Sequence, residues 1–306
     1  MSSADYGKEP KFLPPYGIDE GVTFDGGIKK NTQGYMYFPT GDTTQRNRGR
    51  GILFGGGSPG RTDRIDYIDI PSGGNSIDFG SLAAGSVFGS GAGASSTRGV
   101  FWAGENQYTK LDFVTIATTG NATSFGTSSN SNNGGTCMSS ETRAVYTLGQ
   151  AGNVMEYVTI ASTGNTIDFG DQGIDDNLGK PAGLASPTRG IVSGGYGPSP
   201  YPQSNTIEYI TIATTGNGQD FGDLQQVRQA LSSLGSSTRG FWVGGRDAPA
   251  NFDIIEFVTF GSLGNFTDFG NLSSVKQGPF GLSNATRGIA GGGSFGNTVD
   301  YITMAS

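Results

Sequence analysis

Histidine is absent from this chain of 306 residues. Its absence excludes Ser-His-Asp and Cys-His catalysis, imidazole acid–base chemistry and every histidine-ligated metal site. Cysteine occurs once, at Cys137, so no disulfide can form within the chain. We therefore expect no catalytic residue of these kinds, no bound metal and no cofactor.

Charge and long apolar runs are also scarce. Charged residues make up 15% of the chain, the formal net charge is −7, and the 19 basic residues form no cluster. A nucleic-acid footprint needs such a cluster, so DNA or RNA is not an expected partner. No window approaches the roughly 18 apolar residues of a membrane span. The first residues, MSSADYGKEP, contain no apolar signal segment. We expect no membrane insertion.

Glycine, by contrast, is abundant, with 54 residues at regular places in an internal repeat. The clearest copy covers residues 188–222, which read TRGIVSGG, a variable loop, and NTIEYITIATTGNGQDFG. Each copy begins at an arginine, and successive arginines are 45 to 50 residues apart. These arginines are Arg50, Arg98, Arg143, Arg189, Arg239 and Arg287. A period of this length predicts a repeat architecture.

Within each copy the pattern is one of short strands and tight turns. Runs such as residues 65–70 (IDYIDI) are rich in β-forming residues and are bounded by turn residues. A Gly-Asn pair recurs late in five copies, and both residues tolerate the positive φ that tight hairpins need. No segment shows a helical apolar period. Four short strands per copy, repeated radially, predict an all-β fold, a six-bladed β-propeller.

The two ends of the chain suggest how the ring closes. The sixth copy ends after residues 299–304 without a Gly-Asn turn or a final strand. Residues 22–25 (VTFD) near the N-terminus resemble that missing strand. We expect them to complete the last blade and so to remove an exposed edge. The predicted domains are an N-terminal arm over residues 1–19, a docking strap for a partner, and the propeller over residues 20–306.

The repeat resembles the kelch family over roughly residues 20–306. The shared features are a glycine doublet after a hydrophobic strand and a following acidic–aromatic pair, Glu208–Tyr209. The doublets are Gly194-Gly195, Gly244-Gly245 and Gly291-Gly292. The chain departs from kelch blades by carrying phenylalanine where they usually carry tryptophan. This resemblance implies a kelch-like propeller.

A second resemblance concerns function. The run TIEYITIATTGN…DFGDL, with SPTRG, is similar to tandem repeats in tail-fibre-like and structural proteins of marine bacteriophages, especially cyanophages. It implies a non-enzymatic virion protein on the particle exterior, on the tail, in multiple copies. Its partners would be other virion proteins, bound through the arm or a propeller face, and a glycan or protein of the host surface.

Each repeat arginine is matched by an acid on a later strand of its copy. A buried charge is costly alone and tolerable when paired. We therefore predict six ion pairs that hold the blades in register, in preference to a catalytic arginine cluster, because a catalytic site needs unlike residues that converge once. The predicted pairs are Arg50–Asp66, Arg98–Asp112, Arg143–Glu156, Arg189–Glu208, Arg239–Glu256 and Arg287–Asp300. Trp102 and Trp242 lie in glycine-doublet strands and are expected in the core.

The loops that vary between copies are the candidate binding surface. Because strands alternate in direction, the turns before each arginine and the Gly-Asn turns share one face of the propeller. The loops after the glycine doublets and after DFG share the other face. These are residues 58–64, 105–110, 127–136, 196–204 and 246–251. Variable loops on a rigid scaffold commonly form recognition surfaces. The candidate ligand-binding residues are Tyr108, Tyr196, Tyr201, Arg61, Arg64, Arg246 and Asp247.

Two other functions are compatible with the same features. The first is a purely architectural neck, baseplate or capsid-decoration subunit. The second is a glycan-active enzyme, which needs two carboxylates about 5–10 Å apart across a pocket. Its candidates would be Asp63, Glu105 and Asp247, which lie in different copies.

Overall fold

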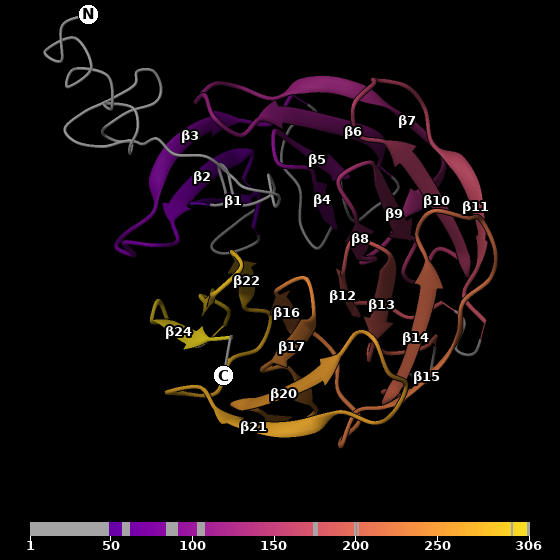
Figure 1. Ribbon diagram of the computed structural model, residues 1–306, viewed down its shortest axis with the longest axis vertical. Helices are drawn as coiled ribbons and strands as arrows, with labels where there is room; N and C mark the ends of the chain where they lie inside the picture. Colours follow the sequence, from indigo (N-terminus) through magenta and orange to yellow (C-terminus); the bar gives the residue numbers. More distant parts are fainter. Residues whose placement is uncertain are drawn as a thin grey trace, which may run out of the picture. The chain divides into compact units, whose positions relative to one another are not determined.

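The computed structural model describes residues 49–56, 62–83, 91–102, 108–173, 177–198, 200, 202–294 and 296–304, except for the side chain of Tyr108. The chain divides into two compact units, Met1–Arg46 and Asn47–Ser306, and the described residues belong to the second. All regular structure in these ranges is β, and no helix there could cross a membrane. Six sheets follow one another around a ring (Figure 1). The all-β class and the six-bladed propeller arrangement are confirmed.

The second to fifth blades each contain four antiparallel strands in chain order. The second blade consists of β4 (Ala92–Ala94), β5 (Arg98–Trp102), β6 (Tyr108–Thr115) and β7 (Thr123–Asn132). The third consists of β8 (Cys137–Ser139), β9 (Arg143–Thr147), β10 (Val154–Thr159) and β11 (Ile167–Asp171). The fourth consists of β12 (Ala182–Ala185), β13 (Arg189–Ser193), β14 (Thr206–Thr211) and β15 (Gln219–Asp223). The fifth consists of β16 (Ser232–Gly235), β17 (Arg239–Val243), β20 (Ile254–Thr259) and β21 (Thr267–Asn271). A small hairpin, β18 (Arg246–Asp247) and β19 (Ala250–Asn251), lies between β17 and β20.

The first and sixth blades have three described strands each. The first contains β1 (Arg50–Phe54), β2 (Arg64–Asp69) and β3 (Ile77–Ser81). The sixth contains β22 (Phe280–Ser283), β23 (Arg287–Gly291) and β24 (Val299–Thr303). By comparison with the other blades, the first is described without its innermost strand and the sixth without its outermost strand. The expected closing strand at residues 22–25 and the arm at residues 1–19 lie outside the described residues.

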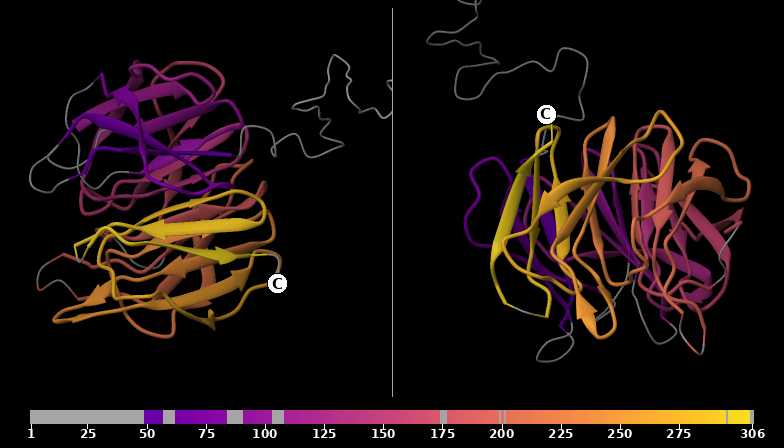
Figure 2. Two further views of the ribbon diagram at one scale, coloured as in Figure 1. Left: turned by 90° about the vertical axis from the view of Figure 1, so that its left-hand side faces the viewer. Right: turned by 90° about the horizontal axis from the view of Figure 1, so that it is seen from below.

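The last blade packs directly against the first. Ile289 of β23 forms one apolar cluster with Ile68 and Ile70, which belong to the first blade. Arg287 donates hydrogen bonds to the carbonyl oxygens of Ile70 and Pro71, at 3.3 and 2.7 Å. Figure 2 shows the two blades side by side. The ring of six is therefore continuous in side-chain packing.

Aromatic pairs fill the outer part of the blades. The phenylalanine of each fourth strand stands edge-on to an aromatic residue of the third strand, with interplanar angles of 75–82°. The pairs are Tyr67–Phe79, Phe113–Phe125, Tyr157–Phe169, Tyr209–Phe221 and Phe257–Phe269. The phenylalanines of the fourth strands thus serve as outer packing residues.

Neighbouring blades are joined at their outer strands by the Gly-Asn turns. The N–H of Gly264 donates to the carbonyl of Phe221 in the preceding blade at 2.8 Å. The side-chain oxygen of Asn265 accepts from the N–H of Asp223 at 3.1 Å. The same two bonds recur at three further interfaces, through Gly120-Asn121, Gly164-Asn165 and Gly216-Asn217. These pairs therefore link blades as well as turn the chain.

Trp102 and Trp242 are fully buried, as predicted. Cys137 is buried in the same apolar cluster as Trp102, whereas Trp242 belongs to a separate cluster. Burial raises the pKa of the Cys137 thiol well above its ordinary value. Because the thiolate is the reactive form, a raised pKa keeps this cysteine protonated and inert at neutral pH.

We expect Cys137 of the native protein at pH 8 to resist alkylation by iodoacetamide, and to react fully once the protein is unfolded in urea. Mass spectrometry of both samples measures the modification. Rapid labelling under native conditions would contradict the burial of this side chain.

Candidate recognition face

The six predicted arginine–acid pairs are wrong. In every blade the strand register places the acid three residues away from the position opposite the arginine. In the fourth blade, Arg189 lies opposite Thr211, whereas Glu208 lies opposite Val192. Side chains alternate between the faces of a strand, so an offset of three puts the two charges on opposite faces of the sheet.

The repeat arginines instead connect one blade to the next. Each guanidinium stacks on the third-strand aromatic of its own blade, 4.2–5.0 Å from the ring centroid. Arg189, for example, lies over Tyr209 and donates to the carbonyl of Phe260 in the following blade at 2.6 Å. Equivalent bonds join Arg50 to Ile116, Arg98 to Ile160, Arg143 to Ile212 and Arg287 to Ile70. The arginines therefore belong to the scaffold.

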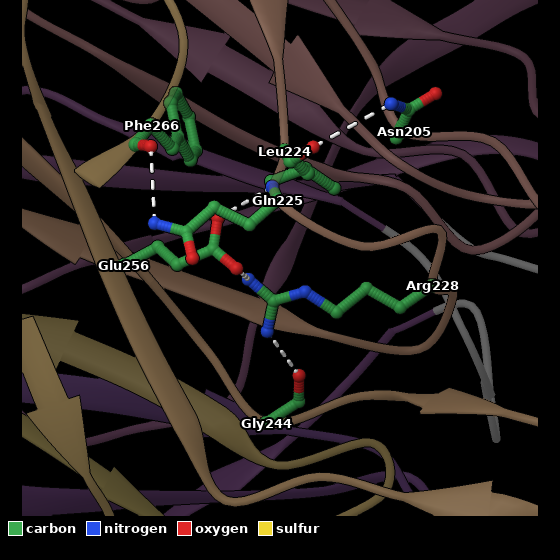
Figure 3. A network of polar contacts seen from close by, with 7 residues as sticks. All are labelled: Asn205, Leu224, Gln225, Arg228, Gly244, Glu256 and Phe266. Atoms are coloured by element: carbon green, nitrogen blue, oxygen red, sulfur yellow. Dashed lines mark hydrogen bonds and ion pairs between the residues drawn. The ribbon is translucent and has the colours of Figure 1, made fainter. Parts of the chain in front are cut away.

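Two of the strand acids form ion pairs with a buried basic side chain from the loop that precedes their blade. Arg228, between β15 and β16, contacts Glu256 of β20 at 2.9 Å, and both side chains are fully buried. Figure 3 shows the Arg228 guanidinium between this carboxylate and the carbonyl of Gly244, to which it donates at 2.6 Å. Burial lowers the pKa of Arg228, and the Glu256 charge opposes that shift. Lys276 lies at the corresponding place before the sixth blade, 3.6 Å from Asp300.

Neither Arg228 nor Lys276 was predicted, although the sequence contains a signal for them. The loops read DLQQVRQ and NLSSVKQ, so the two bases share one repeat position, four residues after a leucine. Aligning the inter-blade loops, and not only the strands, would have identified them. The remaining acids use other donors: Glu156 accepts from Ser129, Asn130 and Thr166, and Glu208 from the N–H of Gly173.

The loop face is organised around a chain of backbone hydrogen bonds. Lys180 donates its N–H to the carbonyl of Gly134 at 2.7 Å, Ala230 to Lys180 at 3.0 Å, and Gly278 to Ala230 at 2.8 Å. All four residues have φ between 54° and 74°. Each stands nine residues before the arginine of its blade, so one such residue per blade ties together the third to sixth blades on this face.

Tyr196 and Arg246 lie within a polar network built on these loops. The hydroxyl of Tyr196 donates to the side-chain oxygen of Gln150 in the third blade at 3.2 Å. The backbone of Tyr196 is bridged to that of Gln203, whose side chain accepts from Gln229 at 2.7 Å. Gln229 is bridged in turn to Arg246. The structure thus brings together two of the predicted residues through three glutamines that were not predicted.

Arg246 and Asp247 form the first strand of the hairpin β18–β19, opposite Asn251 and Ala250. Both side chains are half-buried. The two residues therefore lie in a β-hairpin on the loop face of the fifth blade, where the sequence predicted a loop.

The other predicted binding residues are less informative. Arg64 is exposed and bonded to Asp66 of its own strand at 2.7 Å. The backbone of Tyr108 pairs with Asn132 in β7, while Arg61, Tyr201 and Glu105 lie outside the described residues. The predicted loop at residues 127–136 is largely the end of β7, which runs to Asn132. Asp63 and Asp247 stand in the first and fifth blades, which are not neighbours in the ring.

In the described part of the chain, no group of three or more Asp, Glu or Cys side chains could hold a metal ion. Comparison with known proteins found no matching family model and no significant match to a curated protein sequence.

Proposed function

We propose that this chain is a non-enzymatic structural protein of a bacteriophage particle, a kelch-like propeller on the exterior of the tail, present in several copies. The loop face contacts a glycan or protein of the host surface. The N-terminal segment completes the sixth blade, and its first residues attach the propeller to other virion proteins. The similarity of the repeats to those of phage tail-fibre-like proteins supports the virion assignment.

One observation supports recognition by the loop face. The seventh residue after the repeat arginine is Gln150 in the third blade, Tyr196 in the fourth, Arg246 in the fifth and Ser294 in the sixth. In all four, its backbone bonds or bridges to the loop that enters the blade. The scaffold is therefore constant where the side-chain chemistry changes. Such an arrangement presents an uneven surface to a ligand on a rigid support.

We expect the double substitution Tyr196→Ala with Arg246→Ala to abolish binding of the purified protein to host cells or to glycans on an array. A tyrosine and an arginine are typical anchors of interfaces. The matched control is Thr163→Ala, an exposed substitution on the opposite face of the propeller. Equal binding by both variants, or no binding by the natural chain, would argue against the recognition role.

A purely architectural role is favoured by a different observation. The outer edge of β24 exposes Val299 and Tyr301, at 47% and 66% of their full accessible surfaces. In this alternative, a strand of another virion subunit pairs with that edge in place of the chain's own N-terminal segment. In this role, deleting residues 1–19 prevents incorporation into particles, while exchanging the variable loops does not. Particle assembly with each variant distinguishes the two roles.

A further inference from the structure

The outer edge of β24 forms one side of an open slot for a strand. In the second to fifth blades the third strand pairs with a fourth, but among the described residues β24 pairs only with β23. Tyr301 occupies the position of Tyr209, which is covered by the edge of Phe221. Its 66% exposure reflects the lack of a described aromatic partner.

The neighbouring fifth and first blades also lack described contacts at the places where a fourth strand of the sixth blade and its turn would meet them. A Cβ atom added to Gly222 would lie 2.5 Å from the carbonyl oxygen of Gly264 in the next blade, whereas one added to Gly270 meets nothing within 4 Å. A Gly-Asn turn of the next blade therefore lies against β15, whereas no described Gly-Asn turn lies against β21. On the other side, the turn Gly74-Asn75 is exposed and faces no described outer strand. Three surfaces therefore have no described partner: the edge of β24, the space beside Gly270 and the turn Gly74-Asn75. In the complete interfaces, the equivalent surfaces contact a fourth strand or its turn.

The filled blades define what such a strand must carry. Counted from its phenylalanine, each described fourth strand has an asparagine four residues earlier. The residue three before it donates a hydroxyl to the strand acid in two blades, from Ser76 and Thr166. Gln219, two before it, accepts from the hydroxyl of Tyr209 at 2.7 Å. The residue three after it is a buried leucine in three blades: Leu82, Leu224 and Leu272.

Residues 31–38, NTQGYMYF, have a side chain of the matching kind at each of these positions. With Tyr35 as the aromatic, Asn31, Thr32 and Gln33 take the three earlier positions and Phe38 takes the apolar one. The earlier expectation, residues 22–25, fits poorly. With Phe24 as the aromatic, glutamate takes the asparagine position, and glycine takes both the hydroxyl and the apolar positions.

We propose that residues 31–38 form the outermost strand of the sixth blade of their own chain, with Tyr35 against Tyr301 and Thr32 bonded to Asp300. The proposal deepens the closure proposed above and replaces residues 22–25 as its source. It does not depend on the phage assignment, so its failure would leave that assignment untouched.

Residues 31–38 depart from the described outer strands at Gly34, where those strands have aspartate or serine, and at Met36. The second departure has a counterpart across the interface. Met36 stands where the other outer strands have glycine. The turn that would face it is the only one of the five with a glycine directly before its Gly-Asn pair, Gly73. Its Gly74 has a φ of 104°, compared with 145–155° at Gly120, Gly216 and Gly264. The partner turn therefore differs at the place where a larger side chain must fit.

The length of chain also suffices. From the repeat spacing we expect the innermost strand of the first blade at residues 43–46, so four residues would connect it to the proposed strand. Extended, four residues span roughly 14 Å. Four residues, 133–136, likewise connect the outer strand β7 to the innermost strand β8 of the next blade.

A paired-cysteine experiment on the full chain tests the register. Tyr209 lies opposite Gln219, so Tyr301 should lie opposite Gln33. In a Cys137→Ser background, Gln33→Cys with Tyr301→Cys should form a disulfide within one chain, as shown by peptide mapping. The matched control, Val22→Cys with Tyr301→Cys, should remain reduced. A bond at position 22 instead of 33, a bond between two chains, or no bond in either variant would overturn the proposal.

A second measurement avoids engineered cysteines. Tyr35→Ser should lower the melting temperature by about 4 °C or more, because it removes a buried aromatic partner. Phe24→Ser should leave it unchanged. Equal melting temperatures for the two variants would contradict the assigned strand, while loss of host binding by loop-face variants concerns only the proposed recognition role.

Discussion

Replacing Arg228 with methionine is expected to lower the free energy of unfolding by about 3–5 kcal/mol, the usual cost of removing one partner of a buried ion pair. The substitution leaves the Glu256 carboxylate fully buried without its counter-charge. It also removes the hydrogen bond to Gly244, which fixes the loop entering the fifth blade. Urea unfolding followed by circular dichroism measures the change.

Two further variants make the result specific. Arg228→Met combined with Glu256→Met should recover most of the lost stability, because an apolar pair of similar volume needs no compensation. Lys276→Met should cost less than Arg228→Met, because Asp300 keeps 18% of its side-chain surface exposed and lies 3.6 Å from Lys276. If all three variants unfolded at the same urea concentration, charge burial would not be the cause.

Replacing Gly222 with alanine is expected to separate the outer strands of the fourth and fifth blades. The new Cβ would lie 2.5 Å from a backbone oxygen, Gly264 O, which cannot rotate away. The strain of a φ of 145° adds to this clash. Relief requires the strands to move apart, which breaks the bonds from Gly264 to Phe221 and from Asp223 to Asn265. We expect a total loss of about 2–6 kcal/mol from strain and overpacking.

Gly264→Ala is the matched control, because Gly264 has the same φ of 145° but nothing within 4 Å of its added Cβ. It should show the backbone strain alone, about 1–3 kcal/mol. The difference between the two denaturation midpoints isolates the contact between blades. Equal losses would mean that the outer strands do not depend on this close approach.

The class of fold and the number of blades could be predicted from the sequence alone. These follow from spacing and local chemistry: the interval between arginines counts the blades, the β-rich runs form strands, and Gly-Asn pairs form turns. Burial of Trp102 and Trp242 could also be predicted, because large apolar side chains in glycine-flanked strands have few other places to go.

The candidate site could be predicted only in part. Tyr196 and Arg246 were identified from the variability of their loops, whereas the glutamines that connect them were not. Gln150, Gln203 and Gln229 come from different loops, and nothing in their local sequence shows that the loops meet. The proposed assignment of residues 31–38 rests on the residue pattern of the described outer strands, which could be defined only once the structure showed their contacts.

The pairing of charged side chains, by contrast, depends on how the blades pack in three dimensions. Arg189 and Glu208 lie on adjacent strands, but the loop between them hides the register, and an offset of three places them on opposite faces. Glu256 takes its partner from Arg228, which enters from an inter-blade loop. The strands can be predicted locally because the same residue pattern recurs in each copy of the repeat. Contacts between copies depend on how neighbouring sheets pack, and this packing gives the arginines, the Gly-Asn turns and the buried bases their partners.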